Sequence, residues 1–101
     1  MMDDLMGKLM EAQQRMEEIK TRLSKVTVEG QAENGLVKAT VNGNRELVNL
    51  SLSAEILGDR EALEDLVVVA VNRAMEQASR MNEQEMMGMA QGLLPGGFPG
   101  F

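Results

Sequence analysis

Apolar side chains recur with a seven-residue period over residues 2–26. If Leu9 is taken as the first position of a heptad, every first and fourth position is apolar: Met2, Leu5, Leu9, Ala12, Met16, Ile19, Leu23 and Val26. Such spacing puts one continuous apolar stripe along one face of a helix, as in a coiled-coil seam. We therefore expect a long first helix, part of whose seam meets another helix of the same chain or of a second copy.

The period then changes from that of a helix to that of a strand. Three runs alternate apolar with polar residues: 26–29, 37–41 and 48–52. Gly30 is expected to end the first run, and the pairs Asn34-Gly35 and Asn42-Gly43 separate the runs. Asn-Gly favours tight type I′ turns, whose two central residues both need positive φ. The pattern predicts a three-stranded antiparallel meander with one apolar and one polar face.

A short helical turn and a second long helix are expected after the meander. Ser53 and Gly58 bound the turn, and Asp59 has the side chain of an N-cap for the helix. Apolar residues then recur at helical spacing as far as Met81, and the helix is expected to fray near Gly88. The predicted fold class is therefore α+β, in the order α-β-β-β-α.

Residues 66–71, with the sequence LVVVAV, are apolar on every side of a helix. Their β-branched side chains make a strand the competing assignment, but the helix formers that flank the block favour a helix. A segment that is apolar all round needs to be surrounded, most simply by the sheet on one side and by a partner subunit on the other. The residues expected at this dimer interface are Leu66, Val67, Val68 and Val71.

The length of 101 residues suits one domain, which we expect over residues 1–90, with a flexible tail rich in glycine and proline over residues 91–101. A domain this small buries only about 60–65% of its unfolded surface, so self-association would supply missing burial. The N-terminus lacks the basic region of a signal peptide, and no apolar run approaches the ~18 residues of a membrane span. We expect a cytoplasmic protein without a membrane partner.

The residue types exclude most catalytic chemistries. Histidine and cysteine are absent, so the serines lack an imidazole to activate them and no thiolate can bind a metal. No glycine pattern resembles a phosphate loop, and the acids Glu61, Glu64 and Asp65 suit the start of a helix better than a calcium site. We expect no enzyme activity, no cofactor and no metal.

The net charge of −6 is unevenly distributed, because residues 1–25 hold five bases and five acids and the remainder carries the whole excess. The chain as a whole repels phosphate, and the first helix is its least unfavourable surface for nucleic acid. Three bases lie seven residues apart, each four residues after an acid: Lys8, Arg15 and Arg22. Such pairs stabilise a helix by a few tenths of a kcal/mol, so a self-neutralised, solvated face explains this stripe as well as a DNA-binding face does.

Four central segments resemble the YbaB/EbfC family of bacterial nucleoid-associated proteins. They are GLVKATVNG at 35–43, VNLSL at 48–52, DREALEDLV at 59–67 and AVNRA at 70–74. The first helix, rich in methionine and glutamine, and the LPGGF ending at 94–98 fit as well, so the resemblance covers nearly the whole chain.

This resemblance implies a homodimer whose sheets join at the centre and whose helices project as paired arms. It also implies binding of double-stranded DNA with little sequence specificity, at the nucleoid. The DNA-facing residues that it implies on the two helices are Lys8, Arg15, Lys20, Arg22, Lys25, Arg73 and Arg80. The chain departs from the family pattern in its acidic start, in Arg73 and in residues 81–86, where relatives often carry lysines.

An alternative function is a protein-interaction module that binds a partner protein through methionine-rich helix ends. Methionines gather at the outer end of each predicted helix: Met2, Met6, Met10, Met16, Met81, Met86, Met87 and Met89. Methionine adapts to irregular surfaces and is common at promiscuous contacts. Simple packing of the two helix ends against each other would use the same residues.

Overall fold

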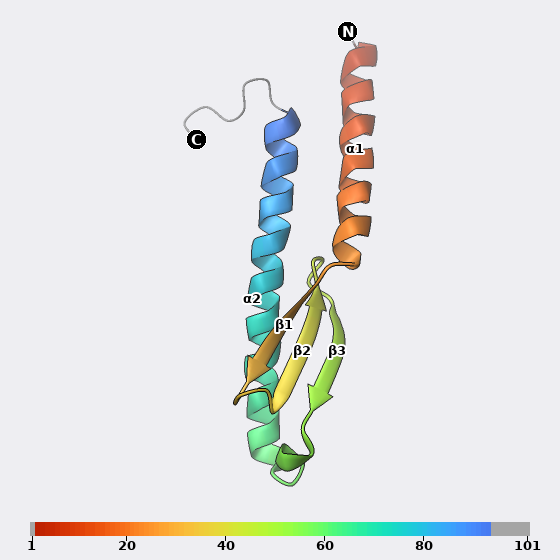
Figure 1. Ribbon diagram of the computed structural model, residues 1–101. Coiled ribbons are helices and arrows are strands. Elements are labelled where there is room, and N and C mark those ends of the chain that lie inside the picture. Colours follow the sequence, from red (N-terminus) through yellow and green to blue (C-terminus); the bar gives the residue numbers. More distant parts are fainter. Residues whose placement is uncertain (1, 94–101) are drawn as a thin grey trace.

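The computed structural model describes residues 2–93 and confirms the expected α-β-β-β-α order (Figure 1). The elements are helix α1 (Met2–Ser24), strands β1 (Thr27–Ala32), β2 (Val37–Asn42) and β3 (Leu47–Leu52), the 3₁₀ turn η1 (Ala54–Ile56) and helix α2 (Arg60–Leu93). Of the tail predicted over residues 91–101, the part from position 94 lies outside the described residues, and α2 continues through the part before it.

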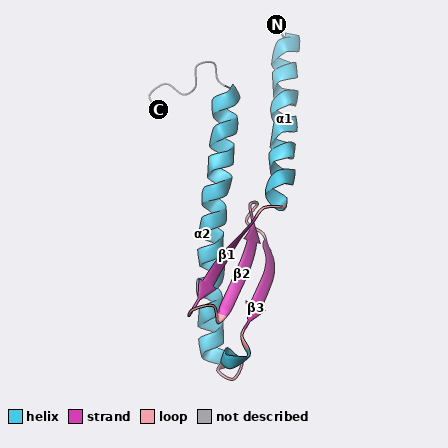
Figure 2. Ribbon diagram, in the orientation of Figure 1, coloured by secondary structure: helices cyan, strands magenta, loops and turns pink. Residues whose placement is uncertain are grey.

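Both long helices project beyond the sheet at the same end of the molecule (Figure 2). α2 runs along the three strands and continues past them, and α1 lies beside this continuation. The resulting shape is elongated, with principal extents of 66 × 27 × 17 Å. Within residues 2–93, neither helix combines the length and apolarity that a membrane crossing requires.

The strands form one antiparallel sheet in the order β1-β2-β3, and α2 packs on one face of β1 and β2. The centre of the core consists of Val37, Ala39 and Val41 on β2 and Ala70, Ala74 and Ala78 on α2. The three alanines are four residues apart, so they share one face of α2 and let the helix approach the sheet closely. Lys38, between the core residues of β2, is exposed on the opposite face, as the alternating pattern predicted.

Gly30 lies inside β1, opposite Ala39, although the sequence predicted that it would end the strand. The helix explains the difference. A Cβ atom at Gly30 would lie 2.3 Å from the carbonyl oxygen of Ala70 and 2.4 Å from the amide nitrogen of Ala74. Gly30 is therefore the place where the α2 backbone touches the strand, and the prediction that it ends the strand is wrong.

Of the two Asn-Gly pairs, Asn34-Gly35 lies between β1 and β2 as predicted, whereas Asn42-Gly43 begins inside β2 and leads into the next loop. Asn34 and Gly35 both have positive φ, 55° and 90°. Asn42 instead ends β2, and the positive φ of the second loop falls on Arg45, at 63°. The buried Asn42 side chain accepts a hydrogen bond from the Asn44 backbone N–H at 3.0 Å. This Asx contact supports a wider loop in place of a type I′ turn.

The loop after β2 also holds the base of α1. The Gly43 N–H donates to the carbonyl oxygen of Leu23 at 2.9 Å, and Nδ2 of Asn44 donates to the carbonyl oxygen of Lys20 at 2.8 Å. From the other side, Nδ2 of Asn82 on α2 donates to the Gly43 carbonyl oxygen at 3.1 Å. One loop therefore fixes α1 to the sheet and to α2.

α2 is helical through residues 66–71, which confirms the helix assignment for the apolar block. Asp59 acts as its N-cap, because Oδ1 accepts the backbone N–H of Ala62 at 3.1 Å. The helix continues past Gly88 to Leu93, where fraying was expected. Glycine costs about 1 kcal/mol relative to alanine inside a helix, and the methionines, alanine and glutamine around it are good helix formers that offset this cost.

Candidate nucleic-acid interface

A groove of about 1010 Å³ lies between the projecting parts of α1 and α2 and extends to the loop after β2. Four amide side chains line it, together with two acids, two bases and three methionines: Glu17, Glu18, Lys20, Arg45, Met10, Met16 and Met86. Because the acids and bases balance, the groove as a whole has no net charge to attract phosphate. Any attraction for a duplex has to come from particular bases near its edges.

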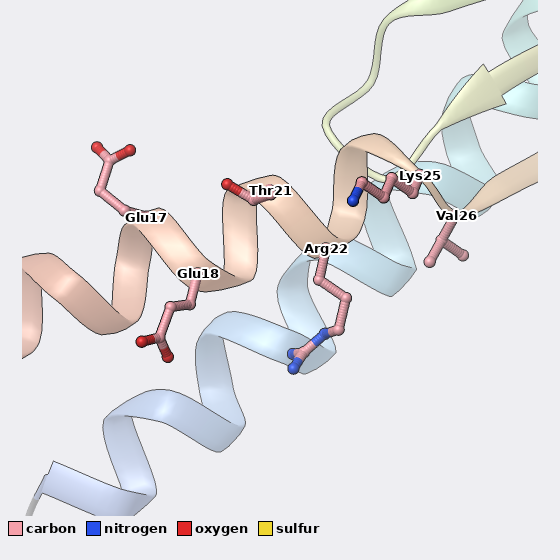
Figure 3. A pocket seen from close by; sticks show the side chains of 6 residues that line it. All are labelled: Glu17, Glu18, Thr21, Arg22, Lys25 and Val26. Carbon is pink, nitrogen blue, oxygen red and sulfur yellow. The ribbon is translucent and has the colours of Figure 1, made fainter.

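A second, more open hollow of about 560 Å³ lies on the last turns of α1 (Figure 3). Figure 3 shows Arg22 directed toward α2, while Glu17 lies on the other side of α1. The Arg22 guanidinium forms an ion pair with the carboxylate of Glu85 on α2, whereas the sequence spacing had paired it with Glu18. Arg22 therefore links the two helices, and Lys25 is the other base that lines this hollow.

Four of the residues implied as DNA-facing already make contacts within the chain. Arg15 lies 3.4 Å from Glu11, and Arg80 lies 3.6 Å from Glu76, both as exposed pairs one helical turn apart. Arg22 forms an ion pair with Glu85, as described above. NH1 of Arg73 donates a hydrogen bond to the carbonyl oxygen of Gln31 at 2.7 Å. Exposed pairs of this kind are worth at most about 1 kcal/mol, so phosphate could displace most of them.

The remaining implied bases are lysines on α1. Lys8, Lys20 and Lys25 are all exposed. Within the described part of the chain, no acidic group forms an ion pair with Lys20 or Lys25. Both lie near the base of α1, where the helix meets the sheet, so two lysines that form no ion pair in the described residues lie at this place.

Sequence reasoning missed Arg45. It is exposed, has the left-handed φ noted above, and lines the groove together with Lys20. No acidic side chain in residues 5–91 forms an ion pair with Arg45. The sequence places Arg45 in a predicted hairpin loop, next to Asn44. Periodicity could not predict that this loop contacts α1.

The residues predicted for a dimer interface divide into two groups on α2. Leu66, Val67 and Val71 are half-buried against the core, whereas the Val68 side chain is 59% exposed. Arg73 reaches β1, so Val67 and Val71, on the opposite flank at about 100° per residue, are turned toward β3. The side of the apolar block that faces the sheet is packed against the core, and its outer side is exposed to solvent.

β3 presents a second open apolar surface beside this flank. All six of its residues are exposed, and α2 packs on β1 and β2 rather than on it. Leu50 lies opposite Ala39 and Leu52 opposite Val37, so both point to the face of the sheet on which α2 lies. We call Leu47, Val48, Leu50 and Leu52 the β3 apolar edge; its side chains are 38–53% exposed.

Comparison with known structures supports this fold. A crystal structure of an uncharacterized protein from Helicobacter pylori superimposes with a TM-score of 0.79, over 84% of this chain and 91% of that one. The two sequences are 21% identical, so this likeness concerns the fold alone.

Sequence comparison identifies the relatives. A nucleoid-associated protein of Flavobacterium johnsoniae is 41% identical over 91 residues, which cover 90% of this chain and 86% of that protein. A nucleoid-associated protein of Chlorobium phaeobacteroides is 39% identical over 94 residues, which cover 93% and 85% of the two chains. The profile of the YbaB/EbfC DNA-binding family matches residues 1–93. The chain therefore belongs to the YbaB/EbfC DNA-binding family.

Proposed function

We propose that this protein is a homodimeric nucleoid-associated protein that binds double-stranded DNA with little sequence specificity. Its relatives are named as nucleoid-associated proteins, which supports a location at the nucleoid. The observation that carries the mechanism is the position of Lys20, Lys25 and Arg45 at the base of two projecting helices. These cations are available to phosphate, while Arg15, Arg22, Arg73 and Arg80 are engaged within the chain.

The open apolar surfaces support the proposed dimer. The β3 apolar edge and the flank of α2 that carries Val67 and Val71 adjoin one another and are covered by nothing else in residues 2–93. Contiguous exposed apolar surface on a small domain marks an interaction site, and a second copy offers the same surface by two-fold symmetry. A dimer built here would leave both pairs of projecting helices free to contact a duplex.

The chemistry of the cations supports the proposed low sequence specificity. Lysine ammonium groups contact phosphates as point charges, and phosphate contacts set position on the duplex without reading bases. If three to five phosphates are neutralised, the logarithm of the binding constant falls with the logarithm of salt concentration with a slope of about −3 to −5. Two duplexes of unrelated sequence should then give similar affinities and similar slopes.

A fluorescence anisotropy titration across salt concentrations tests this proposal. Replacing Lys20 and Arg45 together by glutamate should weaken binding on both duplexes and bring the slope up to about four units closer to zero, because the homodimer loses two bases from each subunit. Lys38→Glu is the matched control, because Lys38 is exposed on the polar face of the sheet, away from the helices. No binding by the dimer at ~50 mM salt would refute the function. An equal loss in the control would move the DNA-binding surface elsewhere.

A further inference from the structure

The apolar seam of α1 is filled only at its base. Leu23 is 1% exposed and Ile19 8%, but Met16 is 46%, Leu9 54% and Leu5 62% exposed. α2 runs alongside, and the two helices nevertheless make few contacts with each other. The groove between them is bounded there by Met10 and Met16 on α1 and by Met86 on α2. We call these three side chains the methionine groove. An apolar seam that is solvated over most of its length lacks an occupant.

The end of the chain has the composition of such an occupant. Residues 86–101 contain no charged side chain, although 26% of the whole chain is charged. The only two aromatic residues of the protein, Phe98 and Phe101, both lie there. Glycine and proline in this segment are typical of tails that do not join a core, but its leucine and phenylalanine side chains gain free energy when they leave water, so the segment has a reason to dock on an apolar surface.

The distances allow the chain to cover its own groove. Phe98 and Phe101 follow the last residue of α2, Leu93, by five and eight positions, which span up to about 17 and 26 Å when extended. Met86 lies seven residues before Leu93, about 10 Å back along the helix axis. The projecting ends of α1 and α2 lie at the same end of the molecule, so a tail leaving α2 starts beside the open seam (Figure 1).

The chemistry of the two surfaces is complementary. Thioether sulfur makes favourable contacts with aromatic rings, worth about 0.3–1.5 kcal/mol each, and flexible methionines adapt to the shape of a ring. Pro95 and Pro99 carry no backbone N–H, so they leave fewer donors to satisfy when the segment is buried. Gln13 and Gln14 line the same groove and can bond the remaining backbone groups.

We propose that Phe98 and Phe101 dock into the methionine groove of their own chain and cover the outer seam of α1. The tail then acts as a third strip of apolar surface between two helices that do not fill the space between them. This contact does not depend on DNA binding, and it gives the methionines at the helix ends an internal partner.

Fluorine NMR tests the contact directly, because fluorophenylalanine incorporated into the full-length protein labels only these two positions. Both resonances should differ from their positions in urea-unfolded protein. Replacing Met10 and Met86 together by alanine should move them toward the unfolded positions. Leu57→Ala is the control, since Leu57 is also exposed but lies just after η1, at the opposite end of the molecule. Native resonances at the unfolded positions, or ones unchanged by the methionine substitutions, would overturn the proposal.

Subunit exchange separates docking within one chain from docking on another. Labelled protein is mixed with an excess of the unlabelled Met10→Ala, Met86→Ala variant, so that most labelled chains acquire a variant partner. Docking within the chain leaves the fluorine resonances where they were. A shift toward the unfolded positions would show that the tail occupies another copy, and would overturn the proposal as stated.

Methionine oxidation provides an independent measurement. Peroxide converts exposed methionine to its sulfoxide, which mass spectrometry can follow at each site. In a chain that ends at Leu93, Met10 and Met86 should oxidise several-fold faster than in the full-length protein. The partly buried Met75, which packs on the core, should be unaffected and serves as the internal control. Equal rates at Met10 and Met86 in the two chains would contradict the docking.

Discussion

The two edge strands of the sheet, β1 and β3, differ in their contacts with α2. At β1, Nε2 of Gln77 donates to the carbonyl oxygen of Glu29 at 3.0 Å, and NH1 of Arg73 donates to that of Gln31 at 2.7 Å. Polar side chains of α2 thus occupy acceptors of this strand. At β3, no side chain of α2 in the described region makes a comparable hydrogen bond.

The side chains of the two edge strands differ in the same sense. Outside its core positions β1 carries polar residues, whereas the β3 apolar edge presents four large aliphatic ones. A β-bulge also interrupts β3: Thr40 pairs with Asn49 and Val41 with Leu47, so Val48 has no pairing partner on β2. An edge strand that is blunted by polar contacts resists further pairing, and an apolar uncovered one invites it. The edge of this chain that is available for pairing is therefore β3.

The largest effect is expected when α2 is forced away from β1. Gly30→Val would place side-chain atoms inside the α2 backbone, so the helix would have to leave β1 and its polar contacts with it. We expect a loss of about 3 kcal/mol or more in the free energy of unfolding, measured by urea titration. Gly7→Ala is the control, because nothing lies within 4 Å of that position. A stability equal to that of the control would show that the helix does not press on the strand.

Charged substitutions on the β3 apolar edge should prevent association. Replacing Leu50 and Leu52 by glutamate should convert the proposed dimer to monomers, because two buried carboxylates would face their copies across the interface. Sedimentation equilibrium should show a dissociation constant raised at least ~100-fold, since each buried, unpaired charge costs several kcal/mol. Ser51→Glu adds charge to the opposite face of the same strand and should leave the dimer intact. Dissociation by Ser51→Glu, or a dimer that tolerates both leucine changes, would exclude this surface.

A milder change uncovers the β1 edge without disturbing the core. Gln77→Ala leaves the Glu29 carbonyl oxygen without its side-chain donor, and we expect a loss of about 1 kcal/mol in unfolding free energy. Arg60→Ala removes an exposed contact with Glu64 at 3.0 Å and should change stability by less than about 0.5 kcal/mol. If the two variants lose the same stability, the contact at β1 is no better than an ordinary surface pair.

The smallest effect concerns a base that is engaged within the chain. Glu85→Gln removes the carboxylate that holds Arg22, whose side chain is 57% exposed, so stability should fall by less than about 1 kcal/mol. The freed guanidinium should raise DNA affinity a few-fold at low salt, and the gain should fade as salt increases. Anisotropy titration of Glu85→Gln beside Glu83→Gln, an exposed acid of the same helix, would separate release of Arg22 from a general loss of negative charge.

The regular elements could be predicted because their periods are local. The seven-residue seam, the alternating runs and the capping Asp59 all depend on neighbours close in sequence, and each appears in the structure. Gly30 could not be predicted, because its role depends on Ala70 and Ala74, about forty residues later. The exposure of β3 could not be predicted either, since alternation predicts an apolar face but not where a single helix will lie across three strands.

The candidate site was predictable only in part for the same reason. Heptad spacing along α1 singles out Lys8, Arg15 and Arg22, and only the resemblance to a family adds Lys20 and Lys25. The partner of Arg22 and the role of Arg73 depend on contacts with α2 and β1, which no helical spacing encodes. Arg45 joins Lys20 only because the loop after β2 bonds the end of α1.

The attachment of α1 through this loop also makes the helix a lever. Its 23 residues span about 34 Å, so a rotation of about 10° at the base would displace the tip by about 6 Å. A handful of hydrogen bonds around Gly43 resist that rotation, including those from Asn44 and Asn82. The width of the opening between the helices is therefore governed by an asparagine-rich hinge far from the tips. Substitutions at that hinge would retune the opening while leaving the core of the sheet untouched.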